Sequence, residues 1–413
     1  MTKYIILICD GGADWPIEEL GNKTIFEAAK LPHLDWIATH GKMGMLKTIP
    51  EGMAPGSECA NMTIMGYRPE KDLTGRGPLE ALSAKVPLND TDLAFRCNFI
   101  TIKKGIIADY SSGHISSEES KPIIASLQSK LHDEGVDFFH GVQYRHILRL
   151  DGERFSANME LTPPHDQLGE PYRQFLPRPL DPDNGKAVKT AAYLRKLIEK
   201  SHAILVDHEI NKKRQAENKE MATHIWPWSG GKKPTIEPFE QKFGLKGSVI
   251  SAVDLIFGLG IAAGMDPIHV KGATGLPNTN YSGKVSAALN ELRQKDLVYL
   301  HIEATDEMGH TGIPQKKIAA IKAFDQYIVK PFIDAEEEFN NQLVIAVLPD
   351  HPTPCKIRTH SREPVPFAIY NPEDNSKNLK QRNYTEEAGK KGEYGLIPDG
   401  ELFMRLFLGK EEK

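Results

Sequence analysis

Two short apolar runs, each followed by acidic residues, limit most strongly what this chain can fold into. Residues 5–9 (IILIC) run into Asp10, and residues 343–348 (LVIAVL) are followed by Asp350 and His351. Short apolar runs bounded by turn residues are typical of buried strands. In open α/β sheets, ligands bind outside the carboxyl ends of the strands. The pattern therefore predicts a sheet with polar side chains gathered at one edge.

Helical and strand patterns alternate through most of the chain. The predicted elements outside the middle region are helices at 24–29, 34–40, 57–65, 252–264 and 315–334, and strands at 5–9, 46–50, 297–302, 343–348 and 366–369. Strands that alternate with helices indicate a mostly parallel sheet with helices on both faces. A length of 413 residues allows two or three domains.

A smaller, strand-rich region interrupts this α/β pattern. Its predicted elements are strands at 93–102, 106–110, 136–141 and 144–150, and helices at 121–134 and 186–199. We predict an α/β core of residues 1–90 and 212–413, with a smaller α+β domain inserted at 91–211. Beyond the insert, a solvated charge run is predicted at 212–219 and a turn at 226–231 (WPWSGG).

Composition excludes several classes of protein. The net charge of −5 and the pI near 6.3 argue against nucleic acid as the main partner, but they allow an anionic small molecule. No apolar run approaches the length of a membrane span, and the short N-terminal run does not predict a signal peptide. The four cysteines form no CxxC pair, which favours reduced thiols in a cytoplasmic protein. The sequence does not determine the oligomeric state.

The segment 305–312 (TDEMGHTG) contains a possible pair of metal ligands. Asp306 and His310 are four residues apart, so they share one face if this segment is helical. A carboxylate and an imidazole in this arrangement suit a divalent metal. The alternative is an exposed helix face with incidental polar residues. His360, in the segment RTHS, adds another imidazole near Asp350 in the sequence.

The acidic residues that follow the strands also have an alternative interpretation. Asp10 precedes two glycines, and Asp350 precedes a histidine, so both could form turns rather than bind ligands. An Asp–His pair at the end of a buried strand is nevertheless hard to explain by packing alone. We therefore interpret Asp10, Asp350 and His351 as candidate metal ligands.

Ser57 follows Ala-Pro-Gly and opens a predicted helix. Its structural interpretation is a helix N-cap, with Glu58 adding favourable charge near the helix start. Its functional interpretation is a nucleophile at a helix N-terminus that binds phosphate. Cys59 is a poorer candidate for the nucleophile than Ser57, because a site with hard metals and a phosphoryl group favours oxygen over sulfur.

Together these residues form the ligand inventory of a two-metal site. One set is Asp306, His310 and His360; the other is Asp10, Ser57, Asp350 and His351. Two divalent ions roughly 4 Å apart stabilise both the attacking and the leaving oxygen in phosphoryl displacement. The residue types admit manganese, zinc, cobalt or magnesium.

Six segments carry a resemblance to a known family. They are ICDGGAD (8–14), MAPGSECANMTIMGY (53–67), LTGRGPLEA (73–81), HIEATDEMGHTG (301–312), LPDHPTP (348–354) and RTHS (358–361). This ordered set resembles cofactor-independent phosphoglycerate mutases of the archaeal type, within the alkaline-phosphatase superfamily. The resemblance implies an alkaline-phosphatase-like core with two divalent metals, manganese being preferred, and no 2,3-bisphosphoglycerate. It also implies that Ser57 is phosphorylated and released in each turnover.

The same resemblance implies that the inserted domain closes on the core and holds the glycerate half of the substrate. Basic and polar residues are the candidates for binding it, because they suit a carboxylate or a phosphate. They are His114, Arg145, His165 and Asp166 in the insert, and Arg76 and Lys284 in the core. For each of these the alternative is a solvated surface residue.

Three functions compete for this chain. The first is a metal-dependent mutase that interconverts 3-phosphoglycerate and 2-phosphoglycerate through phospho-Ser57. The second is a phosphatase or phosphotransferase of the same superfamily with another substrate, such as a proposed homoserine kinase; the tryptophan-rich stretch 225–231 motivates it, although no P-loop is present. The third is a catalytically silent, metal- or metabolite-binding regulator.

Overall fold

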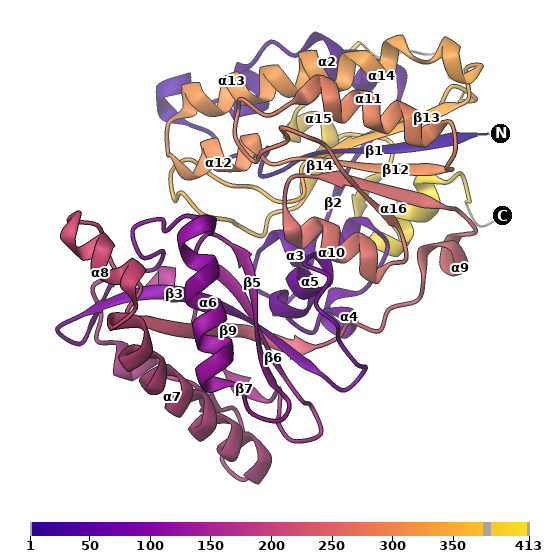
Figure 1. Cartoon of the computed structure of the whole chain (residues 1–413). Helices are drawn as coiled ribbons and strands as arrows, with labels where there is room; N and C mark the ends of the chain where they lie inside the picture. The colour runs from indigo at the N-terminus through magenta and orange to yellow at the C-terminus, as the bar shows by residue number, and fades with distance from the viewer. Residues whose placement is uncertain (1, 375–380, 411–413) are drawn as a thin grey trace. The chain divides into compact units, whose positions relative to one another are not determined.

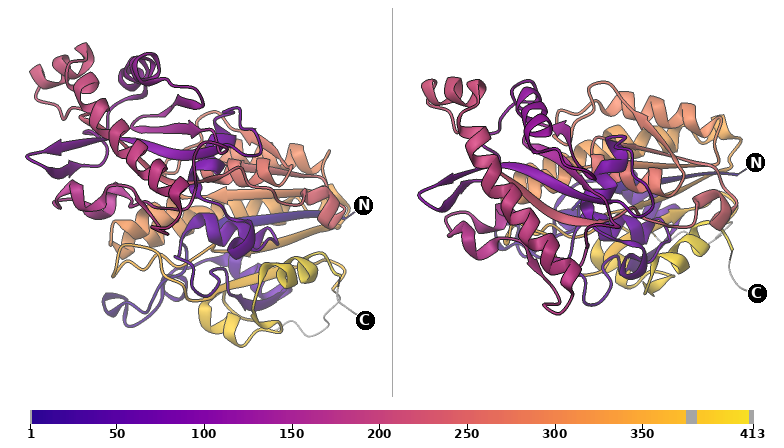
Figure 2. Two further views of the ribbon diagram at one scale, coloured as in Figure 1. Left: turned by 90° about the horizontal axis from the view of Figure 1, so that it is seen from below. Right: turned by 60° about the horizontal axis from the view of Figure 1, so that its bottom comes forward.

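The computed structural model of the chain describes residues 2–374 and 381–410. The chain divides into two compact units, which can be traced by colour in Figures 1 and 2. The core unit is Met1–Leu73 with Thr235–Lys413, and the inserted unit is Thr74–Pro234. Each unit has its own sheet.

The inserted unit is longer at both ends than the expected 91–211. Helix α5 (Arg76–Ser83) packs against strands β3 (Leu93–Lys103) and β9 (His224–Lys232), and β9 is hydrogen-bonded to β3 along most of its length. Both segments therefore fold with the insert rather than with the core. Arg76, which we expected in the core, belongs to the inserted unit for the same reason.

The core unit is built on a mostly parallel sheet. Within the described residues it has eight strands in the order β11-β10-β12-β1-β13-β14-β2-β15. Their bounds are β1 (Lys3–Cys9), β2 (Lys42–Leu46), β10 (Gly247–Ser251), β11 (Asp266–His269), β12 (Leu297–Ile302), β13 (Leu343–Leu348), β14 (Val365–Tyr370) and β15 (Gly395–Ile397). The strands from β11 to β13 are parallel, whereas β14 is antiparallel to both β13 and β2.

Helices cover both faces of the core sheet. Figure 1 shows α11, α13 and α14 on one face and α10 and α16 on the other. The helices of the core unit are α1 (Ile25–Ala28), α2 (Pro32–His40), α3 (Ser57–Ile64), α4 (Pro69–Asp72), α9 (Phe239–Phe243), α10 (Asp254–Ala262), α11 (Tyr281–Leu292), α12 (Ala304–His310), α13 (Pro314–Phe324), α14 (Lys330–Asp334), α15 (Glu386–Lys390) and α16 (Gly400–Phe407). A π-helical turn at Asp325–Val329 joins α13 to α14, so the helix predicted at 315–334 is continuous but not uniform.

Three central strands of the core sheet end at the same level. Cys9 of β1 pairs with Ile302 of β12, and Ile8 pairs with Leu348 of β13. β12 and β13 are buried from end to end and β1 is buried from Ile5 onward, which is why their sequences are almost continuously apolar. Their carboxyl ends consequently deliver the segments that follow them to one edge of the sheet.

The inserted unit has an antiparallel sheet with helices packed on it. Its strands are β3, β4 (Ile106–Asp109), β5 (Val136–Val142), β6 (Arg145–Leu150) and β9, in the order β4-β3-β6-β5 with β9 on the other side of β3; β7 (Met159–Glu160) and β8 (Arg178–Pro179) form a separate pair. Helices α6 (Ser117–Leu131) and α7 (Gly185–Val206) pack against each other, on β5 and β9 respectively, and α8 (Glu209–Ala216) follows α7. Buried side chains such as Phe95, Leu127 and Leu194 form its core.

The structure corrects four local predictions. Residues 226–231 are not a turn: they lie in β9, an edge strand of this sheet, where Pro227 is tolerated because only one side of the strand must donate to a neighbour. The first strand after α2 is β2, which ends at Leu46 instead of beginning there. Helix α6 begins at Ser117, before the predicted start at residue 121, because Ser116 and Glu119 form a capping box.

The fourth correction concerns residues 212–219, which were predicted to be a solvated charge run. Its first half is the end of α8, and Arg214 in it is only 3% exposed. The Arg214 guanidinium donates to Glu119 Oε2 at 2.6 Å and to the Ser112 carbonyl at 2.7 Å. The run is therefore solvated on one face only. Elsewhere in the described residues, the four cysteines are buried and free, and no helix is long and apolar enough to cross a membrane.

Candidate active site

Ser57 is the first residue of helix α3 and not its N-cap. Gly56 occupies the cap position, in an extended conformation with φ of 179°, and makes no side-chain capping bond. The Ser57 hydroxyl instead lies 3.2 Å from Nε2 of His351. The serine is thus directed toward the strand-end residues, which removes the capping interpretation of this residue. Burial, reinforced by Glu58 and Glu70, raises the pKa of the nearby Cys59 thiol to about 12, which makes it a poor nucleophile.

Asp10, Asp350 and His351 form a buried group at the ends of β1 and β13. One ligand atom from each lies within 4.8 Å of the others, and none of the three residues is more than 2% exposed. His351 Nε2 is 3.5 Å from Asp350 Oδ2 and 3.7 Å from Asp10 Oδ1. The Gly11 amide donates to Asp350 Oδ1 at 3.0 Å and so fixes that carboxylate.

Asp306, His310 and His360 gather beside this first group. His310 Nε2 is 3.0 Å from Asp306 Oδ2, and His360 Nε2 is 3.5 Å from Asp306 Oδ1. Asp306, His351 and His360 meet the same 4.8 Å criterion as the first group, so His351 is shared between the two. The His351 and His360 rings lie 4.1 Å apart between centroids. All seven residues predicted as metal ligands therefore lie in one continuous cluster of the core unit.

The electrostatics of the cluster are dominated by three buried carboxylates. Burial, together with the negative charges of Asp350 and Asp306, raises the pKa of Asp10 well above its ordinary value. Burial also acts to raise the pKa of Asp306, but its interactions with the His310 and His360 imidazoles outweigh burial and hold that pKa well below normal. The hydrogen bond to Asp306 in turn raises the pKa of His310 to about 9.

The cluster fits divalent cations. Among the described residues, Asp10 Oδ1 and His360 Nε2 are buried without a hydrogen-bond partner. Buried polar atoms are normally satisfied, so these two have capacity for another ligand. Carboxylate oxygens and imidazole nitrogens are ligands that borderline divalent metals accept. A positive ion would also compensate the carboxylates that now lie close together.

Several residues of this site were not predicted from the sequence. His301 Nε2 lies 3.1 Å from Asp10 Oδ2, and burial lowers the pKa of His301 to about 4. Asn61 donates to Asp350 Oδ2 at 2.8 Å and accepts a hydrogen bond from the Tyr299 hydroxyl. The sequence offered one signal for these residues: His301 stands inside the apolar run of β12, and a buried imidazole needs a polar partner.

A buried lysine ties the two ligand-bearing loops together. Lys317 of α13 has no exposed surface, and its Nζ donates at 2.9 Å to the Ala13 carbonyl, to Asp14 Oδ2 and to the Thr353 carbonyl. The Thr353 hydroxyl donates to Asp306 Oδ1 at 2.5 Å. The loop after β1 and the loop after β13 are therefore fixed to each other directly behind the cluster.

The inserted unit holds a separate basic cluster. Glu80 of α5 lies 2.8 Å from Arg76 Nε and 3.1 Å from Arg96 Nε, and Arg145 adds a third positive charge nearby. Arg96 is 6% exposed, and burial lowers its pKa to about 10. With one carboxylate among three guanidinium groups, the cluster has a positive charge that an anion could balance. The sequence predicted Arg76 and Arg145 but not Arg96.

Aromatic side chains surround this basic cluster. The Arg96 guanidinium lies 4.3 Å above the Trp228 ring, and His165 approaches the same ring at 5.3 Å. Tyr110 contacts His165 and also His114 edge-on, at 6.1 Å and 6.3 Å between centroids. Asp166 lies 3.6 Å from His165. The five predicted substrate-binding residues of the inserted unit therefore belong to one neighbourhood.

Lys284, the remaining predicted substrate-binding residue, belongs to the core unit. It is fully buried, and its Nζ donates to the His301 carbonyl at 3.0 Å. Burial lowers its pKa to about 8. The residue consequently adjoins the metal-type cluster through His301 and is not a surface charge.

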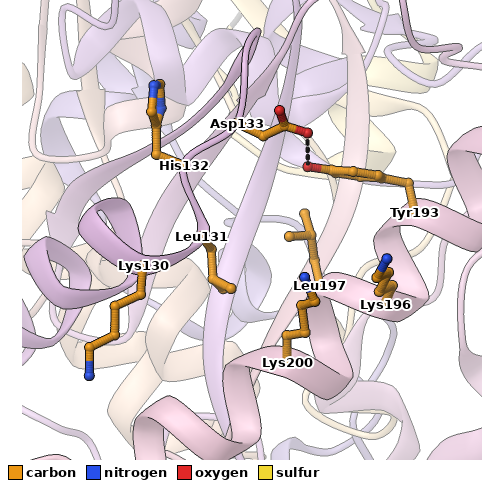
Figure 3. A pocket seen from close by; sticks show the side chains of 8 residues that line it. All are labelled: Lys130, Leu131, His132, Asp133, Tyr193, Lys196, Leu197 and Lys200. Atoms are coloured by element: carbon orange, nitrogen blue, oxygen red, sulfur yellow. Dashed lines mark hydrogen bonds between the residues drawn. The ribbon is translucent and has the colours of Figure 1, made fainter.

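Figure 3 shows a further cavity of the inserted unit that contains none of the predicted site residues. It has a volume of about 230 Å³ and lies between the end of α6 and one face of α7. Lys130, Lys196 and Lys200 line it, and Asp133 there accepts a hydrogen bond from the Tyr193 hydroxyl at 3.2 Å. This cavity is therefore not part of the candidate site.

The fold and the site together define a class. It is an α/β protein with a mostly parallel sheet, an inserted α+β unit, and a serine–histidine–carboxylate cluster at the carboxyl ends of the central strands that fits divalent metals. The family model described as 2,3-bisphosphoglycerate-independent phosphoglycerate mutase matches residues 38–211. The chain belongs to this family, because the curated relatives of that name match it over nearly its whole length.

The similarity to individual relatives is high and extends from end to end. The mutase of Methanosarcina barkeri is 46% identical over 408 residues, which is 99% of this chain and 100% of that protein. A probable mutase of Geobacter sulfurreducens is 41% identical over 413 residues, again 99% of this chain and 100% of that protein. Among solved structures, a Pyrococcus horikoshii protein has a TM-score of 0.80 at 28% identity, covering 100% of this chain and 98% of its own. The cofactor-independent mutase of Thermoplasma acidophilum has a TM-score of 0.66 at 26% identity, covering 99% of both chains.

Proposed function

We propose that this protein interconverts 3-phosphoglycerate and 2-phosphoglycerate through a phosphoserine at Ser57, without 2,3-bisphosphoglycerate. The observation that carries the proposal is the Ser57 hydroxyl, 3.2 Å from His351 Nε2 within the buried cluster that also contains Asp10 and Asp350. The names of the full-length relatives support the same reaction. Because the proposed substrate is a phosphorylated metabolite of central metabolism, we expect the protein in the cytoplasm.

In the proposed reaction the Ser57 oxygen attacks the phosphorus of the bound ester. A bond forms between that oxygen and phosphorus, the bond from phosphorus to the glycerate oxygen breaks, and the hydroxyl proton is transferred to the departing oxygen. The other hydroxyl of the glycerate then attacks the phosphorus of the phosphoserine. The bond from phosphorus to the Ser57 oxygen breaks, and the proton of the attacking hydroxyl is transferred to Ser57. Because α3 begins at Ser57, the backbone N–H groups of its first turn are available to the phosphoryl oxygens.

Asp306, His310 and His360 would hold one divalent ion, and Asp10, Asp350, His351 and the Ser57 oxygen the other. When bound, such ions lower the pKa of the serine hydroxyl and stabilise the charge that develops on the transferring phosphoryl group. Manganese is the preferred candidate, with zinc, cobalt or magnesium as alternatives. His301 and Asn61 would orient Asp10 and Asp350 respectively, because each lies within hydrogen-bonding distance of its partner.

The basic cluster of the inserted unit would bind the glycerate carboxylate. Arg76, Arg96 and Arg145 outnumber Glu80, and His114 and His165 add polar groups at the same place. A mutase must retain glycerate while Ser57 carries the phosphoryl group, because water would otherwise hydrolyse the intermediate. An inserted unit that holds the carboxylate and closes over the core would meet this need.

A second candidate is phosphoryl transfer to or from another small acceptor, such as homoserine. The observation that favours it is the tryptophan-rich strand β9, because Trp228 lies under Arg96 and donates to Asn98 at 3.1 Å. This strand therefore shapes the proposed acceptor site. A different acceptor would use the same serine and the same metals.

An enolase-coupled assay separates these candidates. Purified protein receives 3-phosphoglycerate without 2,3-bisphosphoglycerate, first as prepared, then with EDTA, then with manganese restored. The mutase proposal predicts activity that disappears with the chelator and returns with manganese. Inactivity in protein that is shown to contain metal would contradict it, and homoserine would be the next acceptor tested.

A further inference from the structure

The core unit contains a cavity that the proposed chemistry does not use. Its volume is about 470 Å³, within the range of small-molecule sites. Trp15, Met45, Pro352 and Leu396 contribute apolar surface to it. Leu396 is 62% exposed at β15, an unusual degree of exposure for a large aliphatic side chain. No residue of the metal-type cluster and no residue of the basic cluster lines this cavity.

The charged groups of the lining are mainly acidic. They are Asp14, Glu363, Glu386 and Lys390. Asp14 is already balanced by Lys317, at 2.9 Å, and Lys390 lies 3.9 Å from Glu387 at the surface. Glu363 and Glu386 are left without a cation of their own among the described residues.

Both of these carboxylates are held in place by neutral donors. Glu363 Oε1 accepts from Trp15 Nε1 at 2.9 Å, and Glu386 Oε2 accepts from the Thr24 hydroxyl at 2.7 Å. Each carboxylate has further acceptor sites, since its two oxygens together take about four hydrogen bonds. The cavity thus combines an aromatic and aliphatic wall with two carboxylates that form no ion pair within the described part of the chain.

We propose that this cavity binds a small organic cation, namely an aromatic or aliphatic body that carries a protonated primary amine. The apolar wall would bury the body, and the carboxylates of Glu363 and Glu386 would bind the ammonium group. The same two carboxylates disfavour a phosphorylated or carboxylated metabolite, because like charges close together repel. The proposal does not depend on the reaction proposed for Ser57.

The position of the cavity gives the site a structural context. Pro352 directly follows His351, and it forms β-bridges with Gly12 and Ala13 in the loop after β1. Asp14, in the same loop, is bonded to Lys317 behind the cluster. A bound cation would therefore contact the outer side of the loops that carry the candidate ligands, without reaching the ligands themselves.

The test is a calorimetric titration of the full-length protein with three compounds that share one ring. Tryptamine carries an ammonium group, indole-3-ethanol is neutral, and indole-3-propionate is an anion. We expect tryptamine to bind at least tenfold more tightly than the neutral compound, and the anion to bind least. Equal affinity for all three, or the tightest binding for the anion, would overturn the proposal.

Variants locate the binding at this cavity. Glu363→Gln combined with Glu386→Gln should reduce tryptamine affinity about tenfold, to that of the neutral compound. The matched control is Glu240→Gln with Glu337→Gln, which removes the same charge from exposed positions outside the cavity and should leave the affinity unchanged. Equal effects of the two pairs would show a general charge effect and would refute the site.

A second variant keeps the test valid if the paired substitution fails to fold. Leu396→Ala shortens an exposed side chain at the rim, so folding should be retained. It should weaken tryptamine and indole-3-ethanol equally, by a few fold, because both lose the same apolar contact. Unchanged affinity for both compounds would place the binding elsewhere and contradict the proposal.

Discussion

Replacing Lys317 by Met tests how the two ligand-bearing loops are held together. Methionine keeps the apolar stem of the lysine but removes the ammonium group. Asp14, whose carboxylate has no exposed surface, then loses its cation, and the carbonyls of Ala13 and Thr353 lose a donor. Breaking a buried ion pair by removing one partner costs about 3–5 kcal/mol, because the other charge stays buried without compensation. That is a large part of the ~5–15 kcal/mol that stabilises a typical protein.

Urea unfolding, followed by far-ultraviolet circular dichroism, measures this cost. The matched control is Lys330→Met, which breaks the exposed ion pair with Asp334 on α14; the two side chains are 40% and 57% exposed. Exposed pairs of this kind contribute about 0.3–0.5 kcal/mol. The double variant Lys317→Met with Asp14→Asn removes both charges and should recover part of the loss. Equal shifts for Lys317→Met and Lys330→Met would refute the reasoning.

Four further outcomes are expected. Ser57→Ala should abolish turnover while leaving the unfolding midpoint unchanged; a rate near that of the parent would contradict its role. Asp306→Asn should lower the amount of manganese bound after dialysis, because it removes the carboxylate that His310 and His360 both contact, and full occupancy would argue against this ligand set. Arg96→Leu should raise KM for phosphoglycerate more than it lowers kcat, since the guanidinium is proposed to bind the carboxylate. Burial lowers the pKa of His224 from 6.5 to about 4. As the pH falls, the unfolded chain therefore takes up a proton first, and stability should decrease between pH 6.5 and 4 by up to about 1.4 kcal/mol per pH unit. An unchanged slope of stability against pH in His224→Phe would contradict this.

Local patterns in the sequence were enough to predict the strands that carry the site. β1 and β13 are buried on both faces, so their apolar runs are unbroken, and the polar residues after them follow from the rule that sites lie at the carboxyl ends of strands. Asp306 and His310 are four residues apart on one helix, so their proximity was also predictable. In each case the information lies within a few residues of the chain.

Contacts between distant segments could not be predicted in this way. Lys317 lies in a stretch rich in lysine that resembles a solvated helix face, and its partner Asp14 is 303 residues away. Arg214 lies in a charge run that likewise resembles a solvated helix face, but Glu119 binds it inside the inserted unit. The WPWSGG segment contains turn-forming residues, and only its pairing with β3 makes it a strand. In each of these cases the local structure depends on a partner that is distant in the sequence, and the tertiary fold determines which partner that is.

The central claim is that Ser57 carries the phosphoryl group during turnover. The most direct measurement is acid quenching of the manganese-loaded enzyme during turnover of 3-phosphoglycerate, followed by proteolysis and mass spectrometry of the peptide that contains Ser57. The account predicts a phosphorylated Ser57 that appears with substrate and is absent when the metal is chelated. Full activity with no phosphate on this peptide at any quench time, or phosphate on another residue, would contradict it.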